Sequence, residues 1–170
     1  MNSLASRSRP FLPICVLLGV CTALAPAPAS LASDDLGFPG AVCRASAASY
    51  SGDMQYTSQG SIRNASNSDS EVECPLIKDY SADADGFDDL QAWVYVPSGG
   101  SVDCWAYACD HGDPLGGCEY SAEEVSVGSG VNTLDWNASL DGVPYGYYFM
   151  HCSLSHNAKI LSIWANENDT

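Results

Sequence analysis

Beyond residue 33, apolar and polar side chains alternate in short runs, and the runs are separated by Gly, Asn, Ser, Asp and Pro. A period of two residues is typical of half-buried β-strands, and little of the 3.6-residue period of a helix is present. The pattern predicts an all-β chain, an antiparallel β-sandwich (jelly-roll-like) of about eight short strands stapled by disulfides. The expected strands cover roughly residues 41–48, 58–63, 70–76, 90–97, 101–108, 131–136, 145–154 and 158–166.

Side chains alternate between the two faces of a strand, so each strand can be given an inner and an outer face. We expect the inner face of strand 101–108 to contain Cys104, that of strand 145–154 to contain Cys152, and that of strand 90–97 to contain Leu90 and Val94. The opposite faces then carry large aromatic side chains. These are Trp93, Tyr95, Trp105, Tyr107, Tyr147 and Phe149.

An outward aromatic platform suggests a ligand-binding surface, because an exposed apolar patch of this size calls for a partner. The apolar face of a pyranose ring stacks on indole and phenol rings, and neighbouring Asp, Gln and His side chains can hydrogen-bond its hydroxyls. Carbohydrate is therefore the expected ligand class for this face. The alternative is that the rings are cross-strand pairs that only stabilise the sheet.

The first 32 residues have the three-part layout of a secretory signal peptide. Arg7 and Arg9 precede an apolar stretch of about 15 residues, which is shorter than the roughly 20 residues of a spanning helix. Cleavage after Ala32 would leave residues 33–170 as a single exported domain with no membrane span. A retained anchor and a lipoprotein are the alternatives, and the bulky Val20 before Cys21 disfavours lipidation.

Six cysteines remain after signal removal, and an even number in an exported domain predicts three disulfides. Fifteen pairings are open. From the places of the cysteines in the expected strands and loops we favour 43–74, 104–152 and 109–118. Structural zinc is the alternative, but the spacings lack the paired CxxC pattern. The six residues are Cys43, Cys74, Cys104, Cys109, Cys118 and Cys152.

The exported domain is strongly acidic. It retains four cations against all 21 acidic residues, which gives a formal charge of −17. Such a surface repels nucleic acid and anionic lipid, so neither is expected as a partner. The four cations are Arg44, Arg63, Lys78 and Lys159.

Two acidic segments are candidates for metal binding. Asp83, Asp85, Asp88 and Asp89 surround Gly86, as hard oxygen ligands do in a calcium loop, but no acidic residue closes the loop as in an EF-hand. A solvated acidic loop is the alternative. The segment 110–113 places a histidine between two aspartates, without a recognisable ligand spacing. No catalytic residue and no cofactor are predicted, apart from calcium at the first segment.

Several short motifs resemble a family of small exported cysteine-containing β domains that are abundant in myxobacteria and related bacteria. The motifs are Pro39-Gly40-Ala41-Val42-Cys43-Arg44, Val72-Glu73-Cys74-Pro75-Leu76, Val102-Asp103-Cys104 and Tyr147-Tyr148-Phe149-Met150-His151-Cys152-Ser153-Leu154. The resemblance extends over nearly the whole exported part of the chain. It implies a compact exported β domain with two bridges at the shared cysteines, and it implies no activity.

The sequence alone therefore favours a secreted, periplasmic or extracellular non-enzymatic domain with a structural or interaction role, in contact with an envelope protein or a glycan. A carbohydrate-binding module that uses the outer aromatic face, with Trp93, Trp105 and Tyr147 at its centre, is the first alternative. A calcium-binding protein that uses the loop 83–89 is the second.

Overall fold

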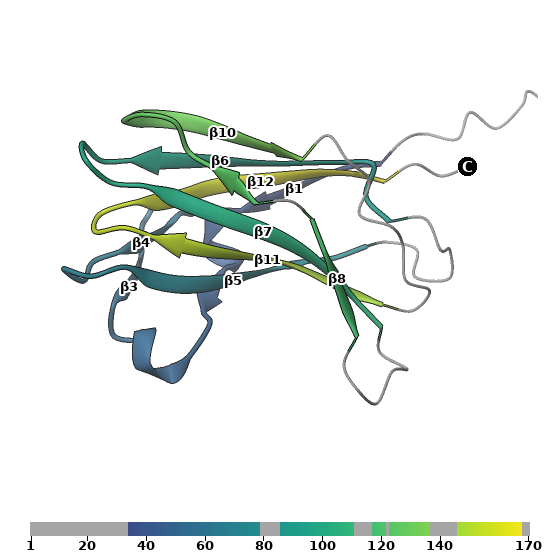
Figure 1. Ribbon diagram of the computed structural model, residues 1–170, viewed down its shortest axis with the longest axis horizontal. Coiled ribbons are helices and arrows are strands. Elements are labelled where there is room, and N and C mark those ends of the chain that lie inside the picture. The colour runs from purple at the N-terminus through teal and green to yellow at the C-terminus, as the bar shows by residue number, and fades with distance from the viewer. Residues whose placement is uncertain (1–33, 79–85, 111–116, 122, 137–145, 168–170) are drawn as a thin grey trace, which may run out of the picture. The chain divides into compact units, whose positions relative to one another are not determined.

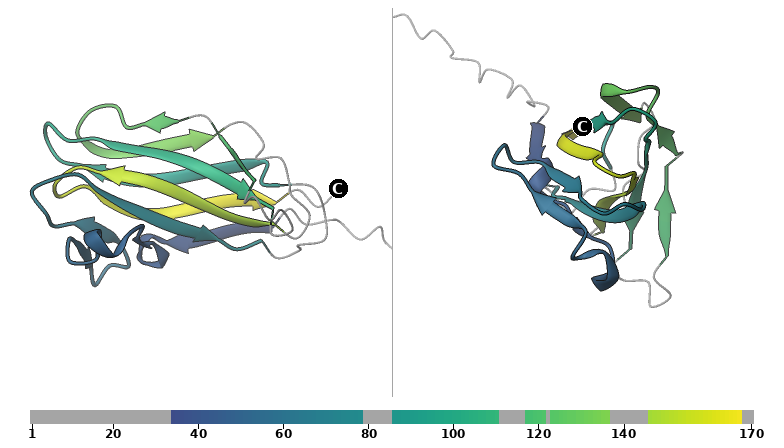
Figure 2. Two further views of the ribbon diagram at one scale, coloured as in Figure 1. Left: turned by 60° about the horizontal axis from the view of Figure 1, so that its bottom comes forward. Right: turned by 90° about the vertical axis from the view of Figure 1, so that its left-hand side faces the viewer.

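Two antiparallel β-sheets pack face to face in the computed structural model, which describes residues 34–78, 86–110, 117–121, 123–136 and 146–167. Figure 1 shows the layer that contains β6 and β12 behind the layer that contains β7 and β11, and Figure 2 shows the same two layers from the side and the end. The predicted antiparallel β-sandwich is confirmed. The predicted signal peptide lies outside the described residues.

Sheet A has the strand order β10-β6-β12-β4-β3, and β1 also pairs with β12. Strand β12 pairs with β4 at Lys159 and Ile160, and with β1 from Ser162 onward, so the two strands share one edge of β12. The strands of sheet A are β1 (Asp34–Pro39), β3 (Met54–Tyr56), β4 (Ile62–Asn64), β6 (Asp89–Val96), β10 (Gly130–Trp136) and β12 (Lys159–Glu167).

Sheet B has the strand order β2-β5-β11-β7-β8, and β9 also pairs with β7. Two short 3₁₀ helices, η1 (Gly40–Val42) and η2 (Ala48–Tyr50), flank β2. The strands of sheet B are β2 (Arg44–Ala45), β5 (Ser70–Leu76), β7 (Val102–Cys109), β8 (Cys118–Tyr120), β9 (Glu124–Val125) and β11 (Tyr147–Leu154).

The core lies between the sheets and is built from alternate residues of the long strands. In β6 the buried residues alternate with partly exposed ones, and the same pattern recurs in β5, β7 and β11. The expected inner faces are confirmed, because Leu90, Val94, Cys104 and Cys152 are all buried. Apolar burial of this kind, rather than local propensity, stabilises the sandwich.

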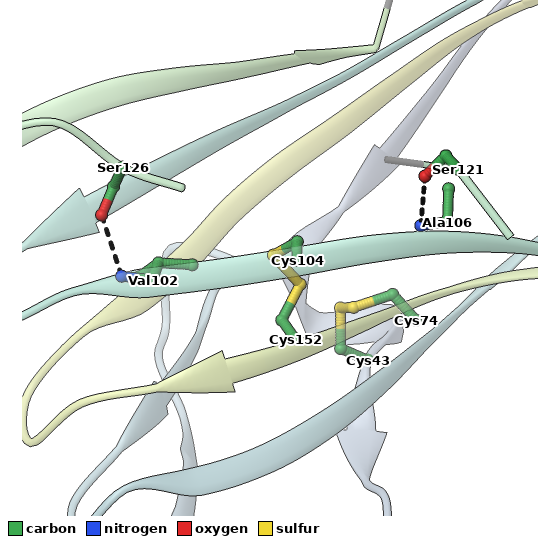
Figure 3. The surroundings of a disulfide bond; sticks show 8 residues. All are labelled: Cys43, Cys74, Val102, Cys104, Ala106, Ser121, Ser126 and Cys152. Atoms are coloured by element: carbon green, nitrogen blue, oxygen red, sulfur yellow. Dashed lines mark hydrogen bonds between the residues drawn. A yellow bond between two sulfur atoms is a disulfide. The ribbon is translucent and has the colours of Figure 1, made fainter. Parts of the chain in front are cut away.

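The three disulfides join Cys43–Cys74, Cys104–Cys152 and Cys109–Cys118, which is the pairing expected from the sequence. Figure 3 shows the first two bridges side by side. Cys104 and Cys152 are direct partners on β7 and β11, and Cys109 and Cys118 are direct partners on β7 and β8. Cys43 immediately precedes β2, which pairs with β5. Among the described cysteines, two bridges therefore join neighbouring strands of sheet B, the third joins β5 to the residue before β2, and none joins the two sheets.

Two serine side chains complete the hydrogen bonding of β7 where its neighbours β8 and β9 are interrupted. The backbone N–H of Ala106 donates to the Ser121 hydroxyl at 2.9 Å, and that of Val102 donates to the Ser126 hydroxyl at 2.9 Å (Figure 3). Each hydroxyl accepts from a strand N–H that would otherwise need another partner.

Six predicted strands match observed strands to within about two residues, and the predicted strand over 41–48 is wrong. That segment contains η1, the two-residue β2 and the start of η2. The segment 58–63 is mostly a turn, and β4 begins only at Ile62. The short strands β1, β3, β8 and β9 were not predicted. Among the described residues, no helix has the length and apolar character that a membrane span requires.

Candidate ligand-binding surfaces

The structure divides the six predicted aromatic residues between two surfaces. Trp93 and Tyr95 lie on β6 of sheet A, whereas the other four lie on β7 and β11 of sheet B. All six are on the outer face of their sheet, because their strand neighbours are the buried core residues. The outer faces of a sandwich point in opposite directions, so the six do not form one platform.

Three rings on the outer face of sheet B lie nearly parallel to one another. Tyr107 and Phe149 are direct cross-strand partners, with ring centroids 4.8 Å apart and planes 5° apart. Tyr147 continues the row, with its centroid 6.1 Å from that of Phe149 and an interplanar angle of 14°. Offset stacking of this kind stabilises the pair β7–β11 and also forms a continuous aromatic ridge.

A hollow of about 410 Å³ lies beside this ridge, on the side of β5. Phe149 has Tyr107 as its partner on one side and Pro75 as its partner on the other, so Phe149 separates Tyr107 from the hollow. Tyr147 is 50% exposed and lines the hollow together with Phe149. The residues that line the hollow are Arg44, Glu73, Pro75, Leu76, Tyr147, Tyr148 and Phe149.

The opposite wall of the hollow is polar. The Arg44 guanidinium lies 3.5 Å from the Glu73 carboxylate, and the Arg44 side chain is 75% exposed. Arg44 and Glu73 also line a second hollow of about 360 Å³, which extends toward β3 and includes the exposed Tyr56. The ion pair therefore lies where the two hollows meet. In this exposed position the pair contributes little to stability, and its groups are accessible to a ligand.

A second polar row crosses sheet B next to the aromatic ridge. His151 is the cross-strand partner of Trp105, and their rings lie 6.3 Å apart with planes tilted by 46°. The His151 imidazole is 3.7 Å from the Glu71 carboxylate, which also accepts a hydrogen bond from the Ser46 hydroxyl at 3.3 Å. Hydrogen-bond donors and acceptors thus flank the ridge, as binding of a hydroxylated ligand requires.

Arg44, Glu73, Pro75 and Tyr56 were not singled out from the sequence. Glu73 and Pro75 occupy outward positions of the correctly predicted strand 70–76, so their face could have been assigned. Their proximity to Tyr147 follows from the pairing of β5 with β11, which alternation within one strand does not show.

Sheet A presents a different aromatic pair on its outer face. Trp93 on β6 and Trp164 on β12 are diagonal neighbours, because Trp93 pairs with Ser162 and Trp164 pairs with Gln91. Tyr95 is 37% exposed, and the Lys159 ammonium lies over its ring, 5.2 Å from the centroid. Trp164 was missed because no inner and outer face was assigned to the last predicted strand.

The predicted calcium ligands are only partly described. Asp83 and Asp85 lie outside the described residues, whereas Asp88 immediately precedes β6 and Asp89 is the first residue of β6. Burial raises the pKa of the Asp89 carboxyl above its ordinary value, and the negative charges of Asp135 and Asp88 raise it further. No group of three metal-binding side chains occurs among the described residues, so calcium stays a prediction. In segment 110–113, only Asp110 is described.

Scans of the chain against protein-family models and against curated proteins find no match. Among solved structures, the chain is similar to a xylan-binding module, CBM15, with 12% identity and a TM-score of 0.50 over 80% of this chain and 97% of that one. It also matches the C-terminal CBM6 of LamC, a marine laminarinase from Zobellia galactanivorans, with 16% identity and a TM-score of 0.46 over 78% of this chain and 98% of that one. At such identities the likeness to the xylan-binding module shows a shared β-sandwich fold.

Proposed function

We propose that this protein is an exported, non-catalytic carbohydrate-binding protein that binds a glycan chain on the outer face of sheet B. The observation that supports this function best is the hollow of about 410 Å³ between the aromatic wall of Tyr147 and Phe149 and the polar wall of Arg44 and Glu73. The three disulfides are typical of an oxidising compartment outside the cytoplasm. A sandwich of similar fold is a xylan-binding module, which makes sugars the first ligand class to test.

Each wall has a distinct part in the proposed binding. The half-exposed ring of Tyr147 stacks on the apolar face of a pyranose, and the edge of Phe149 extends that contact. Arg44 donates hydrogen bonds to sugar hydroxyls and ring oxygens, while the Glu73 carboxylate accepts hydrogen bonds from hydroxyls. The second hollow, beyond the ion pair, accommodates the next part of the chain.

The alternative is a structural role for the aromatic ridge, and it applies most directly to Tyr107 and Phe149. These two are direct cross-strand partners, and such pairs stabilise a sheet without any ligand. Tyr147 has no aromatic partner across the strand, because its partner on β7 is Cys109. Substitution of Tyr147 therefore distinguishes a binding role from a structural role better than substitution of Tyr107 or Phe149.

The test is a titration of the oxidised domain with soluble xylan-, cellulose-, laminarin- and chitin-derived oligosaccharides, followed through the backbone amide NMR signals of β5 and β11. We expect saturable shifts with at least one of these glycans. Tyr147→Ala should weaken this binding about tenfold, which corresponds to about 1.4 kcal/mol. The free energy of unfolding should change by less than that amount, because the side chain is half exposed.

Val127→Ala is the matched control, since Val127 is 88% exposed and lies between β9 and β10. This control should bind as the unmodified domain does. Unchanged affinity of Tyr147→Ala would exclude the hollow as the site. The absence of shifts with every glycan would contradict the proposed function and favour a structural or protein-binding role.

A further inference from the structure

The outer face of sheet A combines two tryptophans at its centre. Trp93 and Trp164 lie on adjacent central strands as diagonal neighbours. Diagonal residues on one face are about 7–8 Å apart, a spacing that allows two indoles to contact different rings of one sugar chain. Both side chains are partly exposed, and among the described residues neither indole takes part in a ring–ring contact.

Small neighbours leave space beside both indoles. Gly37 on β1 is the cross-strand partner of Trp164, and a Cβ atom built on Gly37 meets no atom within 4 Å. The cross-strand partners of Trp93 are Ser162 on one side and Thr133 on the other. Gly37, Ser162 and Thr133 are small and cover little of the indoles beside them, whereas the other partner of Trp164 is the longer Gln91.

Hydrogen-bond acceptors without donors lie next to the indoles. Gln91 lies between Trp164 and Asp135, as the direct partner of both. One carboxylate oxygen of Asp135 and one of Asp89 are shielded from water and have no hydrogen-bond partner among the described residues. A shielded acceptor that lacks a donor is unfavourable in the free protein, and a hydroxyl group of a ligand would satisfy it.

From these observations we infer that the outer face of sheet A is a second glycan-binding surface, with the indoles of Trp93 and Trp164 as the stacking groups and Gln91 and Asp135 as hydrogen-bonding groups. The inference takes its ligand class from the proposed function, but it does not depend on the hollow of sheet B. The ligand is a neutral glycan, because the carboxylates of Asp89 and Asp135 repel uronic acids. Since the two surfaces face in opposite directions, one molecule can bind two glycan chains.

The experiment uses the same oligosaccharide titration, now followed through the backbone amides of β6 and β12 and the indole N–H signals. We expect a second set of saturable shifts in sheet A, independent of those in sheet B. Trp164→Ala should lower the affinity obtained from the β6 and β12 shifts at least tenfold. The affinity obtained from the β5 and β11 shifts should not change. Tyr147→Ala should lower the affinity obtained from the β5 and β11 shifts and leave that obtained from the β6 and β12 shifts unchanged. Polygalacturonate oligosaccharides should cause no shift in sheet A.

Gly37→Leu provides a second variant that removes no core contact. Its side chain fills the open space beside Trp164 and should block the sheet A response while the domain stays folded. Shifts confined to β5 and β11 would overturn the second surface and leave the proposed function intact. Shifts confined to β6 and β12 would support the sheet A surface and exclude the sheet B hollow. No shift in either sheet would overturn both.

Discussion

Asn64 has a fully buried side-chain amide that joins the turn after β4 to the end of β11. Its side-chain nitrogen donates to the backbone carbonyls of Ser68 at 2.7 Å and Leu154 at 2.8 Å, and its side-chain oxygen accepts from the N–H and hydroxyl of Ser66. All the hydrogen-bonding capacity of the amide is used between β4, the following turn and the end of β11.

Asn64→Ala should lower the free energy of unfolding by about 2–3 kcal/mol, because it removes the buried hydrogen bond to the Leu154 carbonyl and the acceptor of the Ser66 N–H. Urea denaturation followed by tryptophan fluorescence measures the change. Asn67→Ala is the matched control in the same turn, and its exposed side chain should contribute less than 0.5 kcal/mol. Equal effects of the two variants would contradict this role for Asn64.

Asp103 provides a pH-dependent prediction. Burial, and then the negative charge of Asp69, raise the pKa of the Asp103 carboxyl above its ordinary value of about 3.8. Ionisation therefore costs the folded state more than the unfolded chain, so wild-type stability falls as the pH rises from 3.8 through the folded-state pKa. Asp103→Asn should raise the unfolding midpoint at pH 7, and this gain should vanish below pH 3.8.

Urea denaturation at pH 7 and pH 3 measures this difference. Glu123→Gln, which replaces an exposed carboxyl, should change stability little at either pH. A gain for Asp103→Asn that is the same at both pH values would exclude ionisation as its cause.

At the scale of the element, η1 depends on the absence of a side chain at Gly40. A Cβ atom built on this buried glycine would lie 2.0 Å from the backbone oxygen of Ile160 on β12. Gly40→Ala should therefore destabilise the domain by about 2 kcal/mol or more, since backbone must move to relieve the clash. The thermal unfolding midpoint reports the effect.

Gly52→Ala is the control for this substitution, because a Cβ atom at Gly52 meets nothing within 4 Å. It should leave the midpoint unchanged or raise it slightly by restricting the unfolded chain. A midpoint for Gly40→Ala equal to that of Gly52→Ala would show that η1 and β12 can separate without loss of stability.

The strands that the sequence predicts well are the long ones with buried residues on alternate positions, such as β5 and β6. Strands of two or three residues, such as β2 and β9, are too short to show a period. Their positions depend on pairing with strands that are distant in sequence. For example, β2 is positioned by its pairing with β5, in which Arg44 is the partner of Glu73. For the same reason, alternation identifies Trp93 and Trp105 as outward residues, but it cannot show that they belong to different sheets.

At the scale of the whole molecule, the disulfides differ in the length of chain that they close. Cys104 and Cys152 are 48 residues apart in sequence, whereas Cys109 and Cys118 are 9 residues apart. By the entropy of the unfolded chain, loss of the first bridge should cost about 4 kcal/mol and loss of the second about 2.5 kcal/mol. Denaturation of the paired Cys→Ala variants measures both, and each variant is the control for the other.

The reverse order of the two costs would mean that strain or packing, rather than chain entropy, determines the contribution of each bridge. The glycan titration should also distinguish the two paired Cys→Ala variants, by their effects on binding at the two sheets. Cys109 and Tyr147 are cross-strand partners, so loss of the 109–118 bridge should affect the sheet B response more than the sheet A response.

The placement of all three bridges in sheet B also has a mechanical consequence. Sheet B is a covalently crosslinked layer, whereas the described part of sheet A is maintained by hydrogen bonds and packing alone. Asp34 is the first residue of β1 and Glu167 the last of β12, and the two are cross-strand partners in sheet A. Tension applied between these two positions would separate β1 from β12 one residue pair at a time, as in unzipping. The crosslinked layer, and the hollow on its surface, would keep their shape under that load.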